Sequence, residues 1–163
     1  MTDGWRELYD SEYPRLLRAL LAIGGDPDAA EDAAQEAFVK AHKQGLVTLE
    51  RPGAWLLVVG TRELLRQRRR RRVEDERWAE RSVSEVSAFD AVADRADLLA
   101  ALRQLPERQR TIVVARYYYG LSYDDIASHF AIKSGTVGAT LHQAIEKLRQ
   151  VQIAGRLARG AMR

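Results

Sequence analysis

Residues 120–149, GLSYDDIASHFAIKSGTVGATLHQAIEKLR, predict two short helices joined by a tight corner. Ser122, followed three residues later by Asp125, matches the start of a capping box, so a first helix is expected to begin there. The second helix is expected to begin at Lys133 or Ser134. Its apolar residues recur at the three- and four-residue spacing of an amphipathic helix, and they are Val137, Leu141, Ala144, Ile145 and Leu148. This combination is typical of a helix-turn-helix, whose second helix contacts bases through its first residues.

An ordinary helical hairpin is the alternative for the same stretch. The corner carries Ala131 where a glycine would take positive φ more easily, and this residue favours the hairpin. The positions left to face a DNA groove are mostly small or uncharged, and they are Lys133, Ser134, Thr136, Gly138, Ala139, Thr140 and Gln143. The helix-turn-helix is favoured, although few of these side chains could read a base edge.

Helices are predicted throughout the chain, because no stretch alternates with period two for long. Their expected starts are marked by a proline, an acidic cap or an apolar run, and they lie at Trp5, Pro14, Asp26-Pro27, Pro52, Leu98 and Pro106. The helix from Pro106 is expected to end at Gly120, a residue suited to a C-cap. The predicted fold class is all-α.

The net charge of +3 is unevenly distributed along the 163 residues. Residues 62–72 contain seven arginines and a single acid, Glu63, whereas residues 73–97 contain eight acids and three arginines. A basic block followed directly by an acidic block indicates a boundary. We therefore expect two small helical domains, at residues 1–72 and 96–150. A flexible acidic linker is expected between them at residues 73–95, and a C-terminal tail at residues 151–163.

Several classes of function are excluded or disfavoured by composition. The chain has no cysteine, so it has neither a disulfide nor cysteine-bound zinc, and its three histidines are too scattered for a standard metal site. No apolar run approaches the roughly 18 residues of a membrane span, and the N-terminus does not resemble a signal peptide. We expect a cytoplasmic protein without membrane insertion or cofactor. The absence of a nucleophile, metal-ligand or phosphate-loop pattern argues against an enzyme.

Both halves of the chain resemble one protein family. The quoted stretch, preceded by LPERQRTIVVARYYY, is similar to region 4 of bacterial RNA polymerase sigma factors of the extracytoplasmic-function (ECF) group. LYDSEYPRLLRAL, DAAEDAAQEAF and AWLLVVGTRELLRQRRRRR are similar to region 2 of the same family, in the same order. The resemblance implies a dissociable subunit that binds core RNA polymerase and directs it to promoter DNA, with an anti-sigma factor as its inhibitor. A helix-turn-helix regulator that acts without core polymerase is the alternative.

The resemblance also implies three sets of contact residues. Core polymerase is expected to contact Asp32, Gln35, Glu36 and Phe38. The minus-10 element, which region 2 reads and helps to open, is expected to contact Arg51, Trp55, Arg62, Arg66, Arg69 and Arg70. The minus-35 element, which region 4 reads, is expected to contact Arg110, Ser122, Lys133, Ser134, Thr136, Thr140 and Gln143.

Some positions depart from the family pattern. Gly138-Ala139-Thr140 stands where the family commonly has K-S-R, and Gln143 stands where arginine is frequent, so several phosphate contacts are expected to be missing. In region 2, Arg62 replaces the asparagine of the family pattern, and Arg66 replaces a frequent aspartate. These departures bear on which promoter sequence is read more than on promoter binding.

Purely structural interpretations compete with some of these assignments. Acidic residues at the start of a helix complement its dipole, Phe38 suits a core, and a basic helix end is usually solvated. Five consecutive arginines, residues 68–72, surround the helix, so phosphate contact is favoured for them. Trp78 and Phe89 are unusual in a charged linker, and we expect them to dock on polymerase, on an inhibitor or against the two domains.

Overall fold

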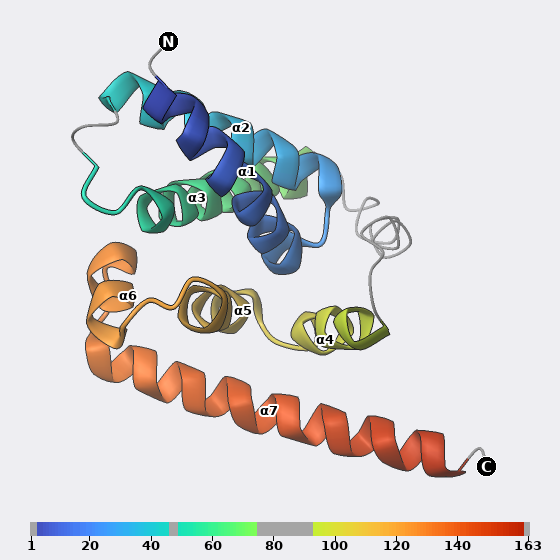
Figure 1. The fold of residues 1–163 in the computed structure, drawn as a ribbon. Helices are drawn as coiled ribbons and strands as arrows, with labels where there is room; N and C mark the ends of the chain where they lie inside the picture. Colours follow the sequence, from blue (N-terminus) through green and yellow to red (C-terminus); the bar gives the residue numbers. More distant parts are fainter. Residues whose placement is uncertain (1–2, 46–48, 75–92, 162–163) are drawn as a thin grey trace. The chain divides into compact units, whose positions relative to one another are not determined.

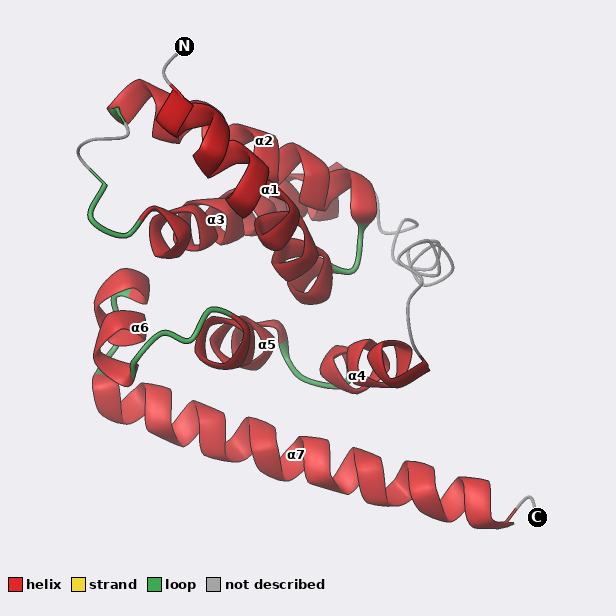
Figure 2. Ribbon diagram, viewed as in Figure 1, coloured by secondary structure: helices red, strands yellow, loops and turns green. Residues whose placement is uncertain are grey.

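The chain divides into two compact units, Met1–Phe89 and Asp90–Arg163 (Figure 1). The computed structural model describes residues 3–45, 49–74 and 93–161, which form helices joined by short loops, without a strand (Figure 2). The all-α prediction is confirmed. The central part of the predicted linker, with Trp78 and Phe89, lies outside the described residues. No helix of the described part has an apolar run that could cross a bilayer.

The first unit is a bundle of three helices, α1 (Asp3–Gly24), α2 (Pro27–Gln44) and α3 (Pro52–Glu74). Its core packs large apolar side chains of α1 and α3 against alanines of α2, and it includes Leu16, Leu20, Ile23, Ala30, Ala33, Ala34, Ala37, Leu56, Leu57 and Leu64. The small alanines let the neighbouring helices approach α2 closely. Asp26 caps α2 as predicted, because its carboxylate accepts the N–H of Asp28 at 3.0 Å.

α1 is one continuous helix, although the sequence pattern predicted a second helix beginning at Pro14. A proline inside a helix removes a backbone hydrogen bond and costs about 3 kcal/mol. Leu8 and Leu16, on either side of Pro14, are both buried, so the apolar face continues past the proline. Packing of this continuous face in the bundle offsets the cost, and the helix does not break.

The second unit contains α4 (Ala93–Arg103), α5 (Glu107–Val113), α6 (Tyr123–Phe130) and α7 (Ser134–Ala161). α5 continues as a π-helix, η4 (Val114–Tyr118), whose wider turn is closed by the Tyr119 N–H bonding to the Val114 carbonyl at 3.1 Å. Gly120 follows with a φ of 66°. This positive φ agrees with the prediction that the helix from Pro106 ends at Gly120.

α6 and α7 form the predicted helix-turn-helix. The Ser122 hydroxyl accepts the N–H of Asp125 at 3.1 Å, which confirms the predicted cap. The corner residue Ala131 adopts the left-handed conformation, with φ 54° and ψ 46°, although this costs an alanine about 1–2 kcal/mol. The unit tolerates this cost because the two helices share a core that includes Ile126, Val137, Leu141 and Ala144. The alanine that favoured an ordinary hairpin therefore does not prevent the turn.

Candidate nucleic-acid interface and docking face

One face of α3 combines an aromatic ring with arginine side chains. Its members follow one another at seven-, four- and three-residue spacing, and they are Trp55, Arg62, Arg66 and Arg69. With 3.6 residues per turn, this spacing places them on one side of the helix. Arg70 borders the same side, and the carbonyl of exposed Arg51 accepts the Trp55 N–H at 3.0 Å. The six residues expected at minus-10 DNA thus lie along α3 and at its start.

The arginine-rich end of α3 divides into two groups. Arg68 donates to the backbone carbonyl of Gly24, and Arg71 donates to the Asp26 carboxylate at 2.9 Å. These two arginines hold α3 against the junction of α1 and α2. Arg69 and Arg70 are exposed, which leaves their guanidinium groups accessible to a phosphate.

Glu63 is a buried acid between α2 and α3. Its side chain is only 5% exposed and accepts hydrogen bonds from Lys40 Nζ and Arg66 Nε, each at 2.9 Å. Burial raises the pKa of such a carboxyl group, but the bonds from Lys40 and Arg66 outweigh burial and hold the pKa of Glu63 below its ordinary value. Lys40 also lies 3.8 Å from Glu36. This network orients Arg66 and joins α3 to α2.

The sequence patterns predicted no role for Lys40 or Glu63. The sequence contained a hint that Glu63 is special, because it is the single acid among seven arginines. It also lies seven residues after the buried Leu56, which places both on the same, buried face of the helix. An acid on a buried helix face requires a cationic partner. Nothing in the sequence identifies that partner as Lys40, which lies 23 residues away.

The residues expected to dock on polymerase differ in exposure. Asp32 and Gln35 are exposed on α2, and Gln35 donates to Glu31 at 3.3 Å. Glu36 is half-buried on the same helix. Phe38 is only 3% exposed, so its ring belongs to the core and not to the surface that a partner could contact.

Phe38 lies at the centre of an aromatic cluster between α1 and α2. Its ring centroid is 5.0 Å from that of Tyr9, 5.7 Å from that of Tyr13 and 6.0 Å from that of Trp5. Burial, and to a lesser degree the neighbouring Tyr9, raise the pKa of Tyr13, which forms a side-chain hydrogen bond with Gln35. The cluster therefore packs α2, which carries the exposed Asp32 and Gln35, against α1.

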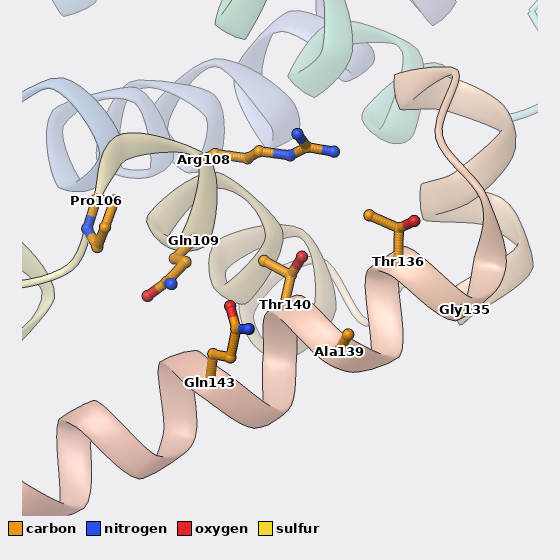
Figure 3. Close-up of a pocket in the computed structure, with 8 residues that line it drawn as sticks. All are labelled: Pro106, Arg108, Gln109, Gly135, Thr136, Ala139, Thr140 and Gln143. Atoms are coloured by element: carbon orange, nitrogen blue, oxygen red, sulfur yellow. The ribbon is translucent and has the colours of Figure 1, made fainter.

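In the second unit, the outward face of α7 borders a groove of about 510 Å³ (Figure 3). The groove lies between α7 and the start of α5, and its walls include Thr136, Ala139, Thr140, Gln143, Arg108 and Gln109. Three of the residues expected at minus-35 DNA meet in it. Lys133 and Ser134 are exposed at the start of α7, where the Ser134 hydroxyl donates to Asp124 at 3.2 Å.

Two further residues expected at minus-35 DNA lie outside the groove walls. Ser122 caps α6 with its side chain. Arg110 is half-buried, and its Nε atom is buried completely. Arg108, for which the family resemblance predicted no contact, is exposed and lines the groove. No local feature separates these two arginines, because the packing of α5 on α7 decides which one reaches the groove.

Comparison with known proteins assigns a family to both units. Residues 8–74 match the model of Sigma-70 region 2, and residues 95–148 match that of Sigma-70, region 4. The ECF RNA polymerase sigma factor SigL of Mycobacterium tuberculosis is 32% identical over 152 residues, which are 88% of this chain and 86% of SigL. The RNA polymerase sigma-E factor of Streptomyces avermitilis is 32% identical over 151 residues, which are 90% of this chain and 83% of that factor.

The fold also matches a solved structure. The sigma factor RpoE in the co-crystal structure with the anti-sigma factor NepR from Bartonella quintana superposes with a TM-score of 0.74 at 20% identity. The match covers 93% of this chain and 98% of RpoE, and it concerns the fold alone. The two family models, the relatives that match over most of their length and the helix-turn-helix of the second unit all indicate the same family. The chain belongs to the extracytoplasmic-function group of RNA polymerase sigma factors.

Proposed function

We propose that this sigma factor binds core RNA polymerase through the exposed residues of α2 and directs it to promoters through α3 and α7. The observation that supports this assignment is that each unit presents side chains suited to DNA contact on the outward face of one helix. The unit that matches region 2 has the aromatic and arginine face of α3, and the unit that matches region 4 has the outward face of its helix-turn-helix.

In the minus-10 step, the exposed arginines of α3 contact DNA phosphates. Such contacts position the nucleic acid without reading its sequence. Trp55 offers a flat ring at the start of the same face, and an unpaired base of the opened element can stack on it. Glu63 fixes the direction of Arg66 relative to Trp55, so that phosphate and base are held together.

In the minus-35 step, the start of α7 enters the major groove. Lys133 and Ser134 lie at the start of the helix and contact the phosphate backbone. Thr136, Thr140 and Gln143 lie further along the same face, and their hydroxyl and carboxamide groups contact base edges. Each of these contacts is weak. Linkage of two readers in one chain, and of both to polymerase, raises the effective concentration of each at its DNA element.

We propose further that the chain has no catalytic activity of its own and acts in the cytoplasm, where it meets polymerase and DNA. Polymerase catalyses RNA synthesis, and this chain selects where synthesis begins. An anti-sigma factor is the proposed inhibitor, and it would cover the surfaces that polymerase needs.

The test is copurification of the full chain with purified core polymerase, followed by run-off transcription from genomic promoter fragments. We expect a stable complex and promoter-dependent transcripts. Asp32→Ala combined with Gln35→Ala should reduce core binding with only a small loss of thermal stability, because both side chains are exposed and Gln35 loses only its side-chain hydrogen bonds with Glu31 and Tyr13. Asp28→Ala is the matched control, since it removes an exposed acid one turn earlier on the same helix and should bind normally.

The alternative function, a helix-turn-helix regulator that acts without core polymerase, predicts a different result. It would bind a specific DNA site with high affinity in the absence of polymerase. If the isolated chain does so and does not bind core polymerase, the proposed function is wrong.

A further inference from the structure

Glu12 is an acid of α1 that lies against the start of α3. Its side chain is 19% exposed, and its Oε2 atom is buried without a hydrogen-bond partner among the described residues. The other oxygen, Oε1, lies 3.8 Å from a guanidinium nitrogen of Arg15 on the same helix. A buried carboxylate oxygen without a donor costs free energy, so a compensating interaction is expected on the side to which it points.

The Oε2 atom points at Gly53, in the first turn of α3. It lies 2.9 Å from the position that a Cβ atom would take at residue 53, and the three atoms nearest to that position all belong to Glu12. A side chain at residue 53 would therefore collide with the carboxylate. Glycine allows this close approach to the helix backbone.

The first turn of α3 lacks a cap from its own segment. It contains no acid, and the residue before the helix is Arg51, whose side chain has no acceptor atom. The N–H groups of Gly53 and Ala54 have no partner within the helix, because they belong to its first turn. In α2, by contrast, Asp26 accepts such N–H groups with its own side chain. The carboxylate of Glu12 supplies the negative charge that the positive end of the α3 dipole favours.

The same turn of α3 carries Trp55, the residue on which an unpaired minus-10 base is proposed to stack. The Trp55 N–H donates to the Arg51 carbonyl at 3.0 Å and closes the turn. Loosening of this turn would change the direction of the indole ring. Stacking depends on that direction, because the base must lie flat against the ring.

We infer that Glu12 is a positioning residue for capture of the unpaired minus-10 base: its carboxylate holds the first turn of α3 and thereby orients the ring of Trp55. This inference rests on the proposed function, because the captured base belongs to the opened promoter. Glu12 contacts no DNA in this role. Its effect is therefore confined to unpaired DNA, whereas phosphate contacts of the exposed arginines act on paired DNA as well.

The test uses the holoenzyme, the complex of the full chain with purified core polymerase. Wild-type holoenzyme first selects promoters from genomic fragments, and the selected promoters are then synthesised in two forms. One is a forked duplex whose minus-10 element is unpaired and contains 2-aminopurine, a base whose fluorescence changes when it stacks. The other is a fully paired duplex, held at a low temperature at which it stays closed. Glu12→Gln should weaken binding to the forked duplex about fivefold and change binding to the closed duplex by less than about twofold.

A double-mutant cycle with Trp55 shows whether Glu12 acts through that ring. Trp55→Ala should weaken binding to the forked duplex and abolish the change in 2-aminopurine fluorescence. Glu12→Gln should have no further effect in the Trp55→Ala background. A purely structural role of Glu12 would lower the Tm without this dependence on Trp55.

Gly53→Ala tests the same contact from the other side. The added methyl group would lie 2.9 Å from the Oε2 atom and should reproduce the loss seen with Glu12→Gln. Combined with Glu12→Ala it should add no further loss, because the atoms nearest to the methyl group are then gone. Glu7→Gln is the matched control, since it neutralises an exposed acid of the same helix and should bind both duplexes like the wild type.

Three results would overturn the inference. In the first, Glu12→Gln binds the forked duplex as tightly as the wild type. In the second, it loses the same factor on the closed duplex, and in the third it loses the same factor again in the Trp55→Ala background. Thermal unfolding followed by circular dichroism checks that each variant is folded, and Gly53→Ala carries the test if Glu12→Gln is not. Failure of the wild-type holoenzyme to bind any forked duplex would instead refute the proposed function.

Discussion

Replacement of Glu63 by glutamine tests how the first unit holds its DNA-facing helix. Glu63→Gln keeps the shape of the side chain and removes its charge. The buried carboxylate currently accepts hydrogen bonds from Lys40 and Arg66 at 2.9 Å each. The variant leaves both cations without an anionic partner at this position.

The size of the effect follows from the exposure of the partners. A hydrogen bond to a charged group contributes about 1.5–3 kcal/mol when it is shielded from water. The side chains of Lys40 and Arg66 are 41% and 53% exposed, so solvent screens both interactions. With about 1 kcal/mol for each bond, the variant should lose about 2 kcal/mol of unfolding free energy. For a small helical unit this corresponds to a fall in Tm of about 10 °C.

Tryptophan fluorescence during urea or thermal unfolding is the suitable assay. Trp5 in α1 and Trp55 in α3 lie in the first unit, and the described residues of the second unit contain no tryptophan, so this signal follows the first unit. Glu36→Gln is the control, because this carboxylate lies 3.8 Å from Lys40 and is 41% exposed. It should change the free energy of unfolding by less than about 0.5 kcal/mol.

The pH dependence supplies a second check. The pKa of Glu63 is lower in the folded state than in the unfolded state. Its stabilisation is therefore fully present above the unfolded pKa of about 4.3 and is lost as pH falls through the folded pKa. The difference between wild type and Glu63→Gln should be largest near neutral pH and should disappear in acid. A variant as stable as wild type at pH 7, or a difference that persists undiminished in acid, would refute this account of the network.

Four further variants test DNA contact, backbone conformation and core packing. Arg69→Ala with Arg70→Ala should weaken holoenzyme binding equally at all promoters and lower the salt slope by roughly one per lost phosphate contact. Gln143→Ala should change the preference among minus-35 sequence variants by about 1–3 kcal/mol. Binding to a library of minus-35 variants at several salt concentrations tests both, and a changed base preference in the arginine variant alone would contradict these roles. Ala131→Gly should stabilise the second unit by about 0.5–1 kcal/mol in thermal unfolding followed by circular dichroism, because glycine adopts its φ of 54° without strain, and a loss of stability would contradict this view of the corner. Phe38→Ala should destabilise the first unit by about 3–5 kcal/mol in the tryptophan assay, and a wild-type transition would contradict its place in the core.

Local sequence patterns predicted the helices and the family of this protein. The caps at Asp26 and Ser122 were visible because each joins a side chain to an N–H group two or three residues further along the chain. The apolar stripe of the last helix was visible because helical periodicity places its members on one face. The motifs of both regions also predicted an ECF sigma factor, and the two family models together with the similarity to the ECF sigma factor SigL confirm that assignment.

Only the tertiary structure decided which of many similar arginines bond to other parts of the fold. Arg68 and Arg71 bond to residues 44 and 45 positions away, while Arg69 and Arg70 between them remain accessible. Packing of α5 on α7 likewise places Arg108 rather than Arg110 in the groove. Caps and periodicity depend on neighbours in the sequence, which can be read directly. The exposure of an arginine depends on which helix faces pack together, and that choice is set by apolar residues far apart in the chain.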